Sequence, residues 1–227
     1  MPLRQTIAFL EDHPSDGSAT KFGGQPDWID EPQWPHSKTS GNPMRFICQV
    51  ALDRNVFADA KGKMAYIFIT DEDEYVDGTW EPDGGENCVV IQPCNTPLAV
   101  RTSDQPTGPT LYTMCSVTGK SRLVPIAREY GVKLTLAEDT AFQPSSVRQT
   151  WDDQKFDEYA ASLDGNKIGG TPIFLQNDEF PDEEPWQLLL QLDSTQVPFS
   201  VNFGDSGVAY AFINAEGTIG KLLWQCA

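Results

Sequence analysis

The residues Gly204-Asp205-Ser206-Gly207 match the motif around the nucleophilic serine of one large protease family. A serine nucleophile needs a general base within hydrogen-bonding reach, normally a histidine. The chain has two histidines, His13 and His36, both in polar stretches, and the residue after the motif is Val208 instead of a further glycine. The motif is therefore interpreted as a turn that leads into a strand. We expect no enzymatic activity and no catalytic residue.

The sequence also contains no convincing motif for a metal site or a nucleotide site. The five cysteines form no CxxC pair, and two histidines cannot complete a zinc site. Asp71, Asp73 and Asp77 before Gly78 faintly resemble a calcium loop, but Tyr75 and Gly84 then stand where two carboxylate ligands belong. No GxxxxGK[ST] or GxGxxG motif occurs. We expect neither a metal nor a cofactor, although cation binding by the acidic loops stays open.

The charge balance restricts the class of partner. The chain of 227 residues carries 33 acidic against 16 basic residues, a net charge of −17. Such a charge repels nucleic acid phosphates and anionic membranes, and attracts basic proteins. Simple solubility is the alternative explanation. The start of the chain has no apolar core long enough for a signal peptide, so reduced cysteines and a cytoplasmic location are expected.

Three sequence phrases occur twice, in the same order. Residues 21–69 contain KFGGQPDWI, PMRFICQVALD and GKMAYIFI, and residues 167–213 contain KIGGTPIF, PWQLLLQLD and GVAYAFI. Each glycine pair with its proline predicts a tight turn, because glycine adopts positive φ freely and proline fixes φ. We predict two duplicated units, at about 21–70 and 167–213, related by a pseudo-twofold axis. A β-rich insertion at 71–149 separates them.

Apolar runs predict most of the strands. The runs at 44–52, 64–69, 88–92, 111–117, 123–126, 132–136, 186–193 and 208–213 are rich in strand-forming residues. The first ten residues are compatible with a helix or a strand. Three prolines, Pro32, Pro35 and Pro43, predict no regular structure between Asp30 and Pro43.

One segment has helical periodicity. Phe156, Tyr159, Ala160 and Leu163 form one apolar stripe, and Asp164-Gly165 provides a stop. This predicts a single main helix at about 150–163 that connects the two units. The predicted fold is therefore α+β and β-rich, with residues 1–227 in one compact domain.

Gln49 and Gln191 stand at equivalent positions of the two units, each within an apolar strand. An unpaired buried amide costs about 1–3 kcal/mol, so each is expected to bond loop backbone, with the glycine turns as the nearest candidates. The alternative is a ligand-binding cleft between the halves, lined by Trp28, Trp34, Gln49 and Gln191, with Trp186 as a further wall.

The acidic loop before the strand at 186–193 is the candidate binding surface. Acidic groups speed the capture of a basic partner, and aromatic anchors supply affinity. The candidate partner-binding residues are Asp178, Glu179, Phe180, Asp182, Glu183, Glu184 and Trp186. A solvated loop without a partner is the alternative.

The repeated phrases resemble the YwqG-like proteins, a bacterial family of unknown function. The shared signature is a GG-P turn at 23–28 or 169–174, the LQ-x-D strand end at 188–193 and the FGDSG-x-AYxFI hairpin at 203–213. The resemblance implies a compact α+β fold with internal pseudo-symmetry and no established activity. Some relatives are similar to members of toxin–immunity gene clusters.

Together these features predict a non-enzymatic cytoplasmic protein that binds a basic protein partner through acidic loops. An immunity protein that neutralises a basic toxin is the specific form expected. The alternative is a small-molecule-binding protein or an enzyme with a carboxylate-lined cleft between the halves. Neither nucleic acid nor membrane is expected as a partner.

Overall fold

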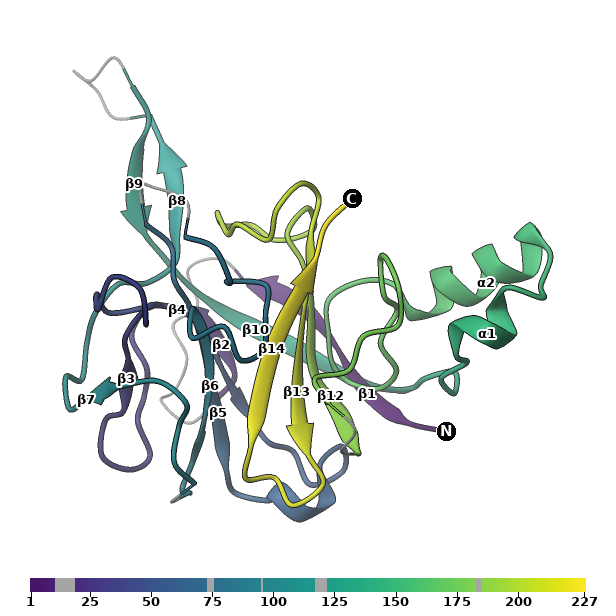
Figure 1. Ribbon diagram of the computed structural model, residues 1–227, viewed down its shortest axis with the longest axis horizontal. Helices are drawn as coiled ribbons and strands as arrows, with labels where there is room; N and C mark the ends of the chain where they lie inside the picture. Colours follow the sequence, from purple (N-terminus) through teal and green to yellow (C-terminus); the bar gives the residue numbers. More distant parts are fainter. Residues whose placement is uncertain (11–18, 73–75, 95, 117–121, 183–184) are drawn as a thin grey trace.

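Ten antiparallel strands close into a barrel at the centre of the computed structural model (Figure 1). The structure describes residues 1–10, 19–72, 76–94, 96–116, 122–182 and 185–227. The barrel strands are β1 (Leu3–Leu10), β2 (Lys21–Gly23), β4 (Arg45–Ala51), β5 (Met64–Ile69), β6 (Asn87–Gln92), β10 (Glu129–Glu138), β11 (Lys167–Gly169), β12 (Trp186–Asp193), β13 (Val208–Asn214) and β14 (Gly220–Gln225).

The remaining elements lie outside the barrel. They are the pair β3 (Trp34–Pro35) and β7 (Thr102–Ser103), the hairpin β8 (Tyr112–Cys115) and β9 (Val124–Ala127), a 3-10 turn at Ala58–Ala60, and the helices α1 (Ser145–Arg148) and α2 (Asp153–Leu163). Figure 1 shows the β8–β9 hairpin projecting from one end of the molecule and the two helices lying beside the barrel at the other.

The strand order consists of two matching runs. From the β1–β10 pair, one run passes through β2, β4, β5 and β6, and the other through β11, β12, β13 and β14. Gln49 lies opposite Tyr66 in the first run, and Gln191 lies opposite Tyr210 in the second. The same irregularity occurs in both, between Phe46 and Cys48 and between Leu188 and Leu190. The repeated phrases therefore occupy matching positions in the two halves of the barrel.

The two runs meet at a narrow seam. Within the described part of the chain, β6 and β14 pair through one residue pair, Val89 opposite Gly220. A Cβ atom at position 220 would lie 2.3 Å from the Cγ1 atom of Val89, so only glycine permits this approach. The seam is thus the place where, among the described residues, neighbouring barrel strands share the fewest paired residues.

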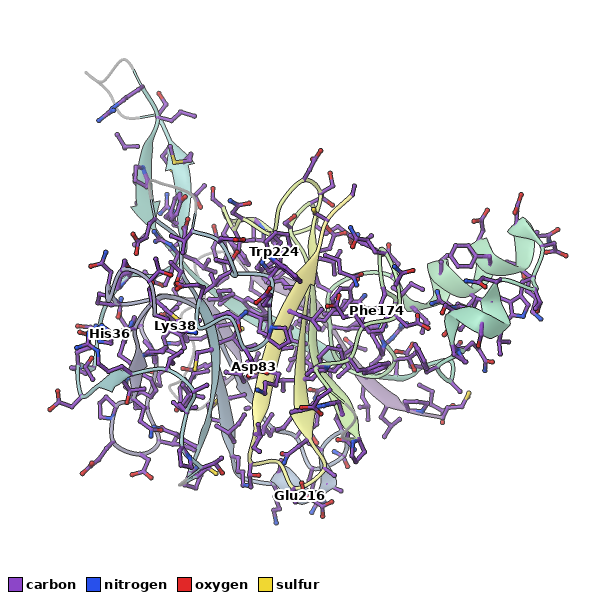
Figure 2. All side chains as sticks on the ribbon, viewed as in Figure 1. His36, Lys38, Asp83, Phe174, Glu216 and Trp224 are labelled. Carbon is purple, nitrogen blue, oxygen red and sulfur yellow. The ribbon has the colours of Figure 1, made fainter. Side chains whose placement is uncertain are left out.

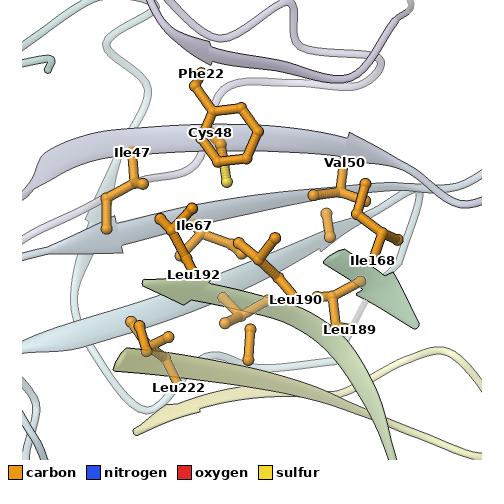
Figure 3. Packing of buried hydrophobic residues seen from close by; sticks show 14 of the residues in the cluster. Phe22, Ile47, Cys48, Val50, Ile67, Ile168, Leu189, Leu190, Leu192 and Leu222 are labelled. Carbon is orange, nitrogen blue, oxygen red and sulfur yellow. The ribbon is translucent and has the colours of Figure 1, made fainter. Parts of the chain in front are cut away.

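The interior of the barrel is apolar (Figure 3). Phe22, Cys48, Val50, Leu190 and Leu192 are among the buried residues that point into it. Two smaller clusters cover the outside of the barrel, one around Trp34 and Phe68 and one around Phe174 and Phe212. Because both faces of β4, β5, β12 and β13 are covered, these strands are continuous apolar runs in the sequence.

The predicted α+β class is wrong, because the fold is mostly β. The barrel closes on itself and needs no helical layer to cover an open sheet. The helices have only 4 and 11 residues. The α2 helix lies within the segment 150–163 that was predicted as helical, and the Asp152 side chain caps it by accepting from the Lys155 backbone amide at 2.8 Å.

The structure adds detail to the strand predictions. The predicted β-rich segment 71–149 supplies β6 and β10 to the barrel, and the first ten residues, predicted as a helix or a strand, contain the strand β1. Residues 220–225 form β14, for which no strand was predicted. A two-residue strand, β3, also forms in the proline-rich stretch after Asp30. No helix in the described ranges is long and apolar enough to cross a bilayer.

Candidate functional site

Gln49 and Gln191 are buried and use their amides within the fold. The Oε1 atom of Gln49 accepts from the backbone amide of Asp27 at 2.8 Å, and its Nε2 donates to the carbonyl of Ala19 at 2.9 Å. The Oε1 atom of Gln191 accepts from the backbone amide of Ile173 at 3.0 Å. Both side chains therefore hold the loop that follows the glycine turn, one residue beyond the proline.

A tyrosine and a second glutamine continue each set of bonds across the sheet. Tyr66 accepts from the Ile29 amide at 3.0 Å, and Tyr210 accepts from the Leu175 amide at 3.1 Å. Gln92 and Gln225 bind the next residue of each loop in the same way, at 3.2 and 3.0 Å. Burial raises the pKa of Tyr66 to about 12 and raises the pKa of Tyr210 further, so both hydroxyls stay protonated. These side chains anchor the two loops.

The tryptophans predicted to line a cleft pack in the outer cluster of the first half. Trp34 is fully buried, and its Nε1 donates to the carbonyl of Met44 at 2.9 Å. The Trp28 ring lies 4.6 Å from the ring of Tyr66, centroid to centroid. Neither tryptophan, nor Gln49 or Gln191, lines the cavities described below. The structure does not bring these four residues together around a cleft.

The acidic segment, residues 178–184, forms several of its contacts within the fold. Asp178 forms an ion pair with Arg148 of α1, and the side chain of Glu179 accepts from the Nε2 atom of Gln225 at 2.9 Å. Phe180 packs edge-on against Phe174, with ring centroids 5.4 Å apart. Glu183 and Glu184 lie outside the described residues. Asp178 and Glu179 thus fix the position of the segment.

Asp182, which is exposed, and Trp186, which is half-buried, form the end of this segment. The indole Nε1 of Trp186 donates to the Oδ1 atom of Asp182 at 2.9 Å. Trp186 lines two separate cavities, which we name the seam cavity and the edge cavity. Among the partner-binding residues predicted from the sequence, Trp186 is therefore the one that lines both cavities.

The seam cavity lies where the two halves of the barrel meet. Its volume is about 300 Å³, and its wall includes Val89, Gly220, Asp182 and Trp186. Asp83 and Lys221, also in the wall, form an ion pair with each other. Figure 2 shows Asp83 in front of the barrel, between the labelled His36 and Phe174.

The one thiol in the seam cavity wall is poorly suited to nucleophilic chemistry. Cys88 is buried, and burial raises its thiol pKa to about 12. Because the thiolate is the nucleophile, a thiol with this pKa stays inert at neutral pH. The seam cavity offers polar and apolar contacts for a bound molecule.

The edge cavity lies beside the first residues of β12. Its volume is about 450 Å³, and none of its lining residues carries a charge. The lining residues are Pro2, Leu3, Val56, Phe57, Phe142, Gly169, Gly170, Thr171, Pro172, Phe180, Trp186, Gln187 and Leu188. Aromatic rings from three parts of the chain therefore surround an open strand edge.

The Gly204–Gly207 motif forms a turn, as predicted. Gly204 and Ser206 have φ values of 78° and 49°, in the left-handed region, and Ser206 Oγ donates to its neighbour Asp205. The ring nitrogens of His36 lie 2.9 Å from the Gly41 carbonyl and the Ser103 hydroxyl, so this histidine is engaged elsewhere. His13 lies outside the described residues.

A metal site is not formed by the part of the chain that the structure describes. No group of three or more histidine, cysteine, aspartate or glutamate side chains is arranged to hold an ion there. Asp73 of the calcium-like pattern lies outside that part.

The sequence reasoning overlooked the lysines that begin both repeated phrases. Lys167 is buried and donates to the Oδ2 atom of Asp139 at 3.1 Å and to the Leu163 carbonyl at 2.6 Å. Lys21 likewise binds carboxylates, Asp27 at 2.7 Å and Glu129 at 3.2 Å. Burial lowers the pKa of Lys167 to about 8, although Asp139 opposes this shift. The repeated KxGG pattern was the signal that could have identified these pairs.

Comparison with known proteins gives a family of unknown function. The sequence matches no curated protein. The family model described as "Domain of unknown function (DUF1963)" matches residues 20–218, which include both halves of the barrel up to the start of β14. The chain belongs to this family.

Proposed function

We propose that this chain is a non-enzymatic protein that binds a basic protein partner through the exposed end of its acidic segment. The observation that carries the proposal is the Asp182–Trp186 pair, a carboxylate bonded to an indole on a segment between two cavities. Tryptophan is enriched among residues that dominate binding energy, and a neighbouring carboxylate favours a cationic partner.

The fold supports this proposal by preorganising the segment. The ion pair of Asp178 with Arg148 and the bond of Glu179 with Gln225 hold its first residues. Less conformational entropy is then lost when a partner binds. The net charge of −17 adds long-range attraction for a basic protein.

The specific form of the proposal follows the resemblance to the YwqG-like proteins. A cytoplasmic immunity protein would cover the functional surface of a basic toxin with its own acidic surface. Such binding requires no catalytic group in this chain.

The test is affinity capture from the native host with three forms of the chain. The wild type is compared with Asp182→Lys and with Asp104→Lys, which makes the same charge change at an exposed residue that follows β7, outside the barrel. We expect the wild type and Asp104→Lys to capture the same basic protein and Asp182→Lys to lose it. Equal capture by all three forms, or capture of no basic protein, would contradict the proposal.

A second candidate function rests on the seam cavity. Two carboxylates, Asp83 and Asp182, together with Trp186 line a cavity of about 300 Å³ between the halves, the lower end of the size of small-molecule sites. Native mass spectrometry of the protein from its host tests this candidate. A bound small molecule that Val89→Trp displaces would favour it, and a ligand-free mass would count against it.

A further inference from the structure

The two halves of the barrel differ at one strand edge. In the first half the chain covers the edge of β4 with its own residues 108–111. Phe46 of β4 forms a parallel bridge with Thr110, and its backbone amide donates to the carbonyl of Pro109 at 2.9 Å. This short segment therefore covers the edge of β4 through a single parallel bridge.

Side chains hold this covering segment in place. A guanidinium nitrogen of Arg45 donates to the Thr110 carbonyl at 2.6 Å, and Gln25 exchanges two hydrogen bonds with the backbone of Gly108. Leu111 is fully buried beside Gly23. The first half thus shows how this edge binds an extended peptide.

In the second half, the part of the chain that the structure describes repeats the edge without a covering segment. Counting from Gln191 as the counterpart of Gln49 places Leu188 at the position of Phe46 and Gln187 at that of Arg45, with the same strand irregularity after Leu188. The pairing between β11 and β12 ends at Ile168 and Leu190. None of the bridges formed by described residues on that side reaches Leu188, and the edge cavity lies there instead.

The edge cavity of the second half occupies the place of only part of the segment 108–111 that covers the first half. Val56 contacts Gly169 as Leu111 contacts Gly23, so the place of the buried leucine is already taken. The uncovered part of the edge corresponds to residues 108–110. An open strand edge presents unpaired backbone groups and is a ready template for another chain.

We propose that the edge cavity binds an extended segment of the partner protein, which adds to β12 as a parallel strand, as residues 108–110 add to β4. One carbonyl of the segment accepts from the Leu188 amide, and the next accepts from the Gln187 side chain. An aliphatic or proline side chain enters the uncharged space between Phe142, Phe180 and Trp186. Basic residues flank the segment, because they complement the charge of −17.

This inference rests on the proposed function for the nature of the partner, but its test needs no natural partner. The probe is a synthetic peptide, two lysines followed by residues 105–113 of this chain, QPTGPTLYT. Amide and indole N–H signals of the ¹⁵N-labelled full chain are followed by NMR during titration. The Phe46 amide is an internal control, since its edge is already covered.

We expect saturable shifts at Leu188 and at the Trp186 indole, with a dissociation constant of about 1 mM or below. The Phe46 signal should not change, and a scrambled peptide should give no saturation. Gln187→Ala, at an exposed residue, should weaken binding about fivefold, the equivalent of one hydrogen bond. The matched variant Gln149→Ala, also exposed, should bind as the wild type does.

Four results would overturn the inference. They are no saturation at about 5 mM peptide, an equal response to the scrambled peptide, unchanged affinity in Gln187→Ala, and a concentration-dependent dimer that involves Leu188, which would assign the edge to a second copy. Affinity capture of a basic protein that depends on Asp182 would survive each of these results, so the two proposals can fail separately.

Discussion

Gln191 and Tyr210 lie opposite each other on β12 and β13, and together they bind both backbone groups of Ile173. Gln191 accepts from the Ile173 amide at 3.0 Å, and Tyr210 donates to its carbonyl at 2.8 Å. Gln49 and Tyr66 bind the amide and carbonyl of Asp27 in the same way, at 2.8 and 2.9 Å. The loop that leads to the acidic segment is thus fixed to the barrel through both backbone groups of Ile173, in addition to the bonds at Leu175 and Gln176.

Replacing Gln191 tests this anchor. Gln191→Leu removes the partner of the Ile173 amide and of the Gly165 carbonyl, and one of the two donors to the Leu163 carbonyl. We expect a loss of about 2–4 kcal/mol in the free energy of unfolding, because buried polar groups are left unpaired. Urea denaturation measures it. Gln187→Leu, on the same strand but exposed, should cost less than about 0.5 kcal/mol; equal losses would show that the anchor is unimportant.

The buried side chain of Lys167 should make the free energy of unfolding depend on pH in the alkaline range. Burial lowers the pKa of Lys167 to about 8 in the folded chain, below its value of 10.5 in the unfolded chain. Between these values the unfolded chain binds more protons, so the free energy of unfolding contributed by Lys167 rises with pH. From pH 8 to 10 we expect the wild type to gain roughly 1–2 kcal/mol relative to Lys167→Met.

Other buried groups make the opposite contribution to the pH dependence of the free energy of unfolding. Because they are present in both the wild type and Lys167→Met, their contribution cancels in the difference between the two proteins. Burial raises the pKa of the Tyr66 and Tyr210 hydroxyls and of the Cys48 and Cys88 thiols. The contribution of these groups to the free energy of unfolding therefore falls as pH rises. Urea denaturation of both proteins at several pH values gives the difference. A difference that stays constant or falls from pH 8 to 10 would contradict the low pKa of Lys167.

The five thiols should divide into two classes. Cys48 and Cys88 are buried with raised pKa values, whereas Cys94, Cys115 and Cys226 are partly exposed. We expect three thiols of the native protein to react readily at pH 8 and the other two only on unfolding. Mass spectrometry after brief alkylation counts the modified sites. Early modification of Cys88 would indicate that the seam opens in solution.

The ion pair between Arg148 and Asp178 should control the acidic segment. Arg148→Met leaves the mostly buried carboxylate of Asp178 without its cation. We expect faster amide exchange in α1 and in residues 176–182, and a loss of about 3 kcal/mol in the free energy of unfolding. Hydrogen exchange with mass spectrometry measures both segments. Exchange confined to α1 would show that the segment is held by other contacts.

The repeated phrases allowed the strands β4, β5, β12 and β13 to be predicted, although not the barrel that they form. These strands are covered on both faces and are therefore apolar throughout. The strand β14 was not predicted, because its apolar run KLLWQ is short and lies outside the three repeated phrases. The fold class was wrong for a topological reason. Closure of the barrel depends on β1 and β10, which pair across 129 residues of sequence in the case of Thr6 and Thr135. No local pattern encodes such a pairing.

The candidate site was predictable in part. Trp186 and Asp182 were selected for their types and for their place in a variable loop, and both line a cavity. Trp28 and Trp34 were selected as a cleft wall, yet they pack against Tyr66 and Phe68, since aromatic residues beside a strand are first of all needed to cover it. The open edge at Leu188 becomes visible only when the two halves are compared in space.

The affinity of the captured partner for the wild type and for Asp182→Lys tests the central claim most directly. Calorimetry at low and at raised salt concentration would show a loss of at least about tenfold in Asp182→Lys, with a smaller loss at raised salt, because screening weakens charge pairs. The variant Asp104→Lys should bind within about twofold of the wild type. Equal affinities of all three proteins at both salt concentrations would contradict binding through Asp182 and Trp186.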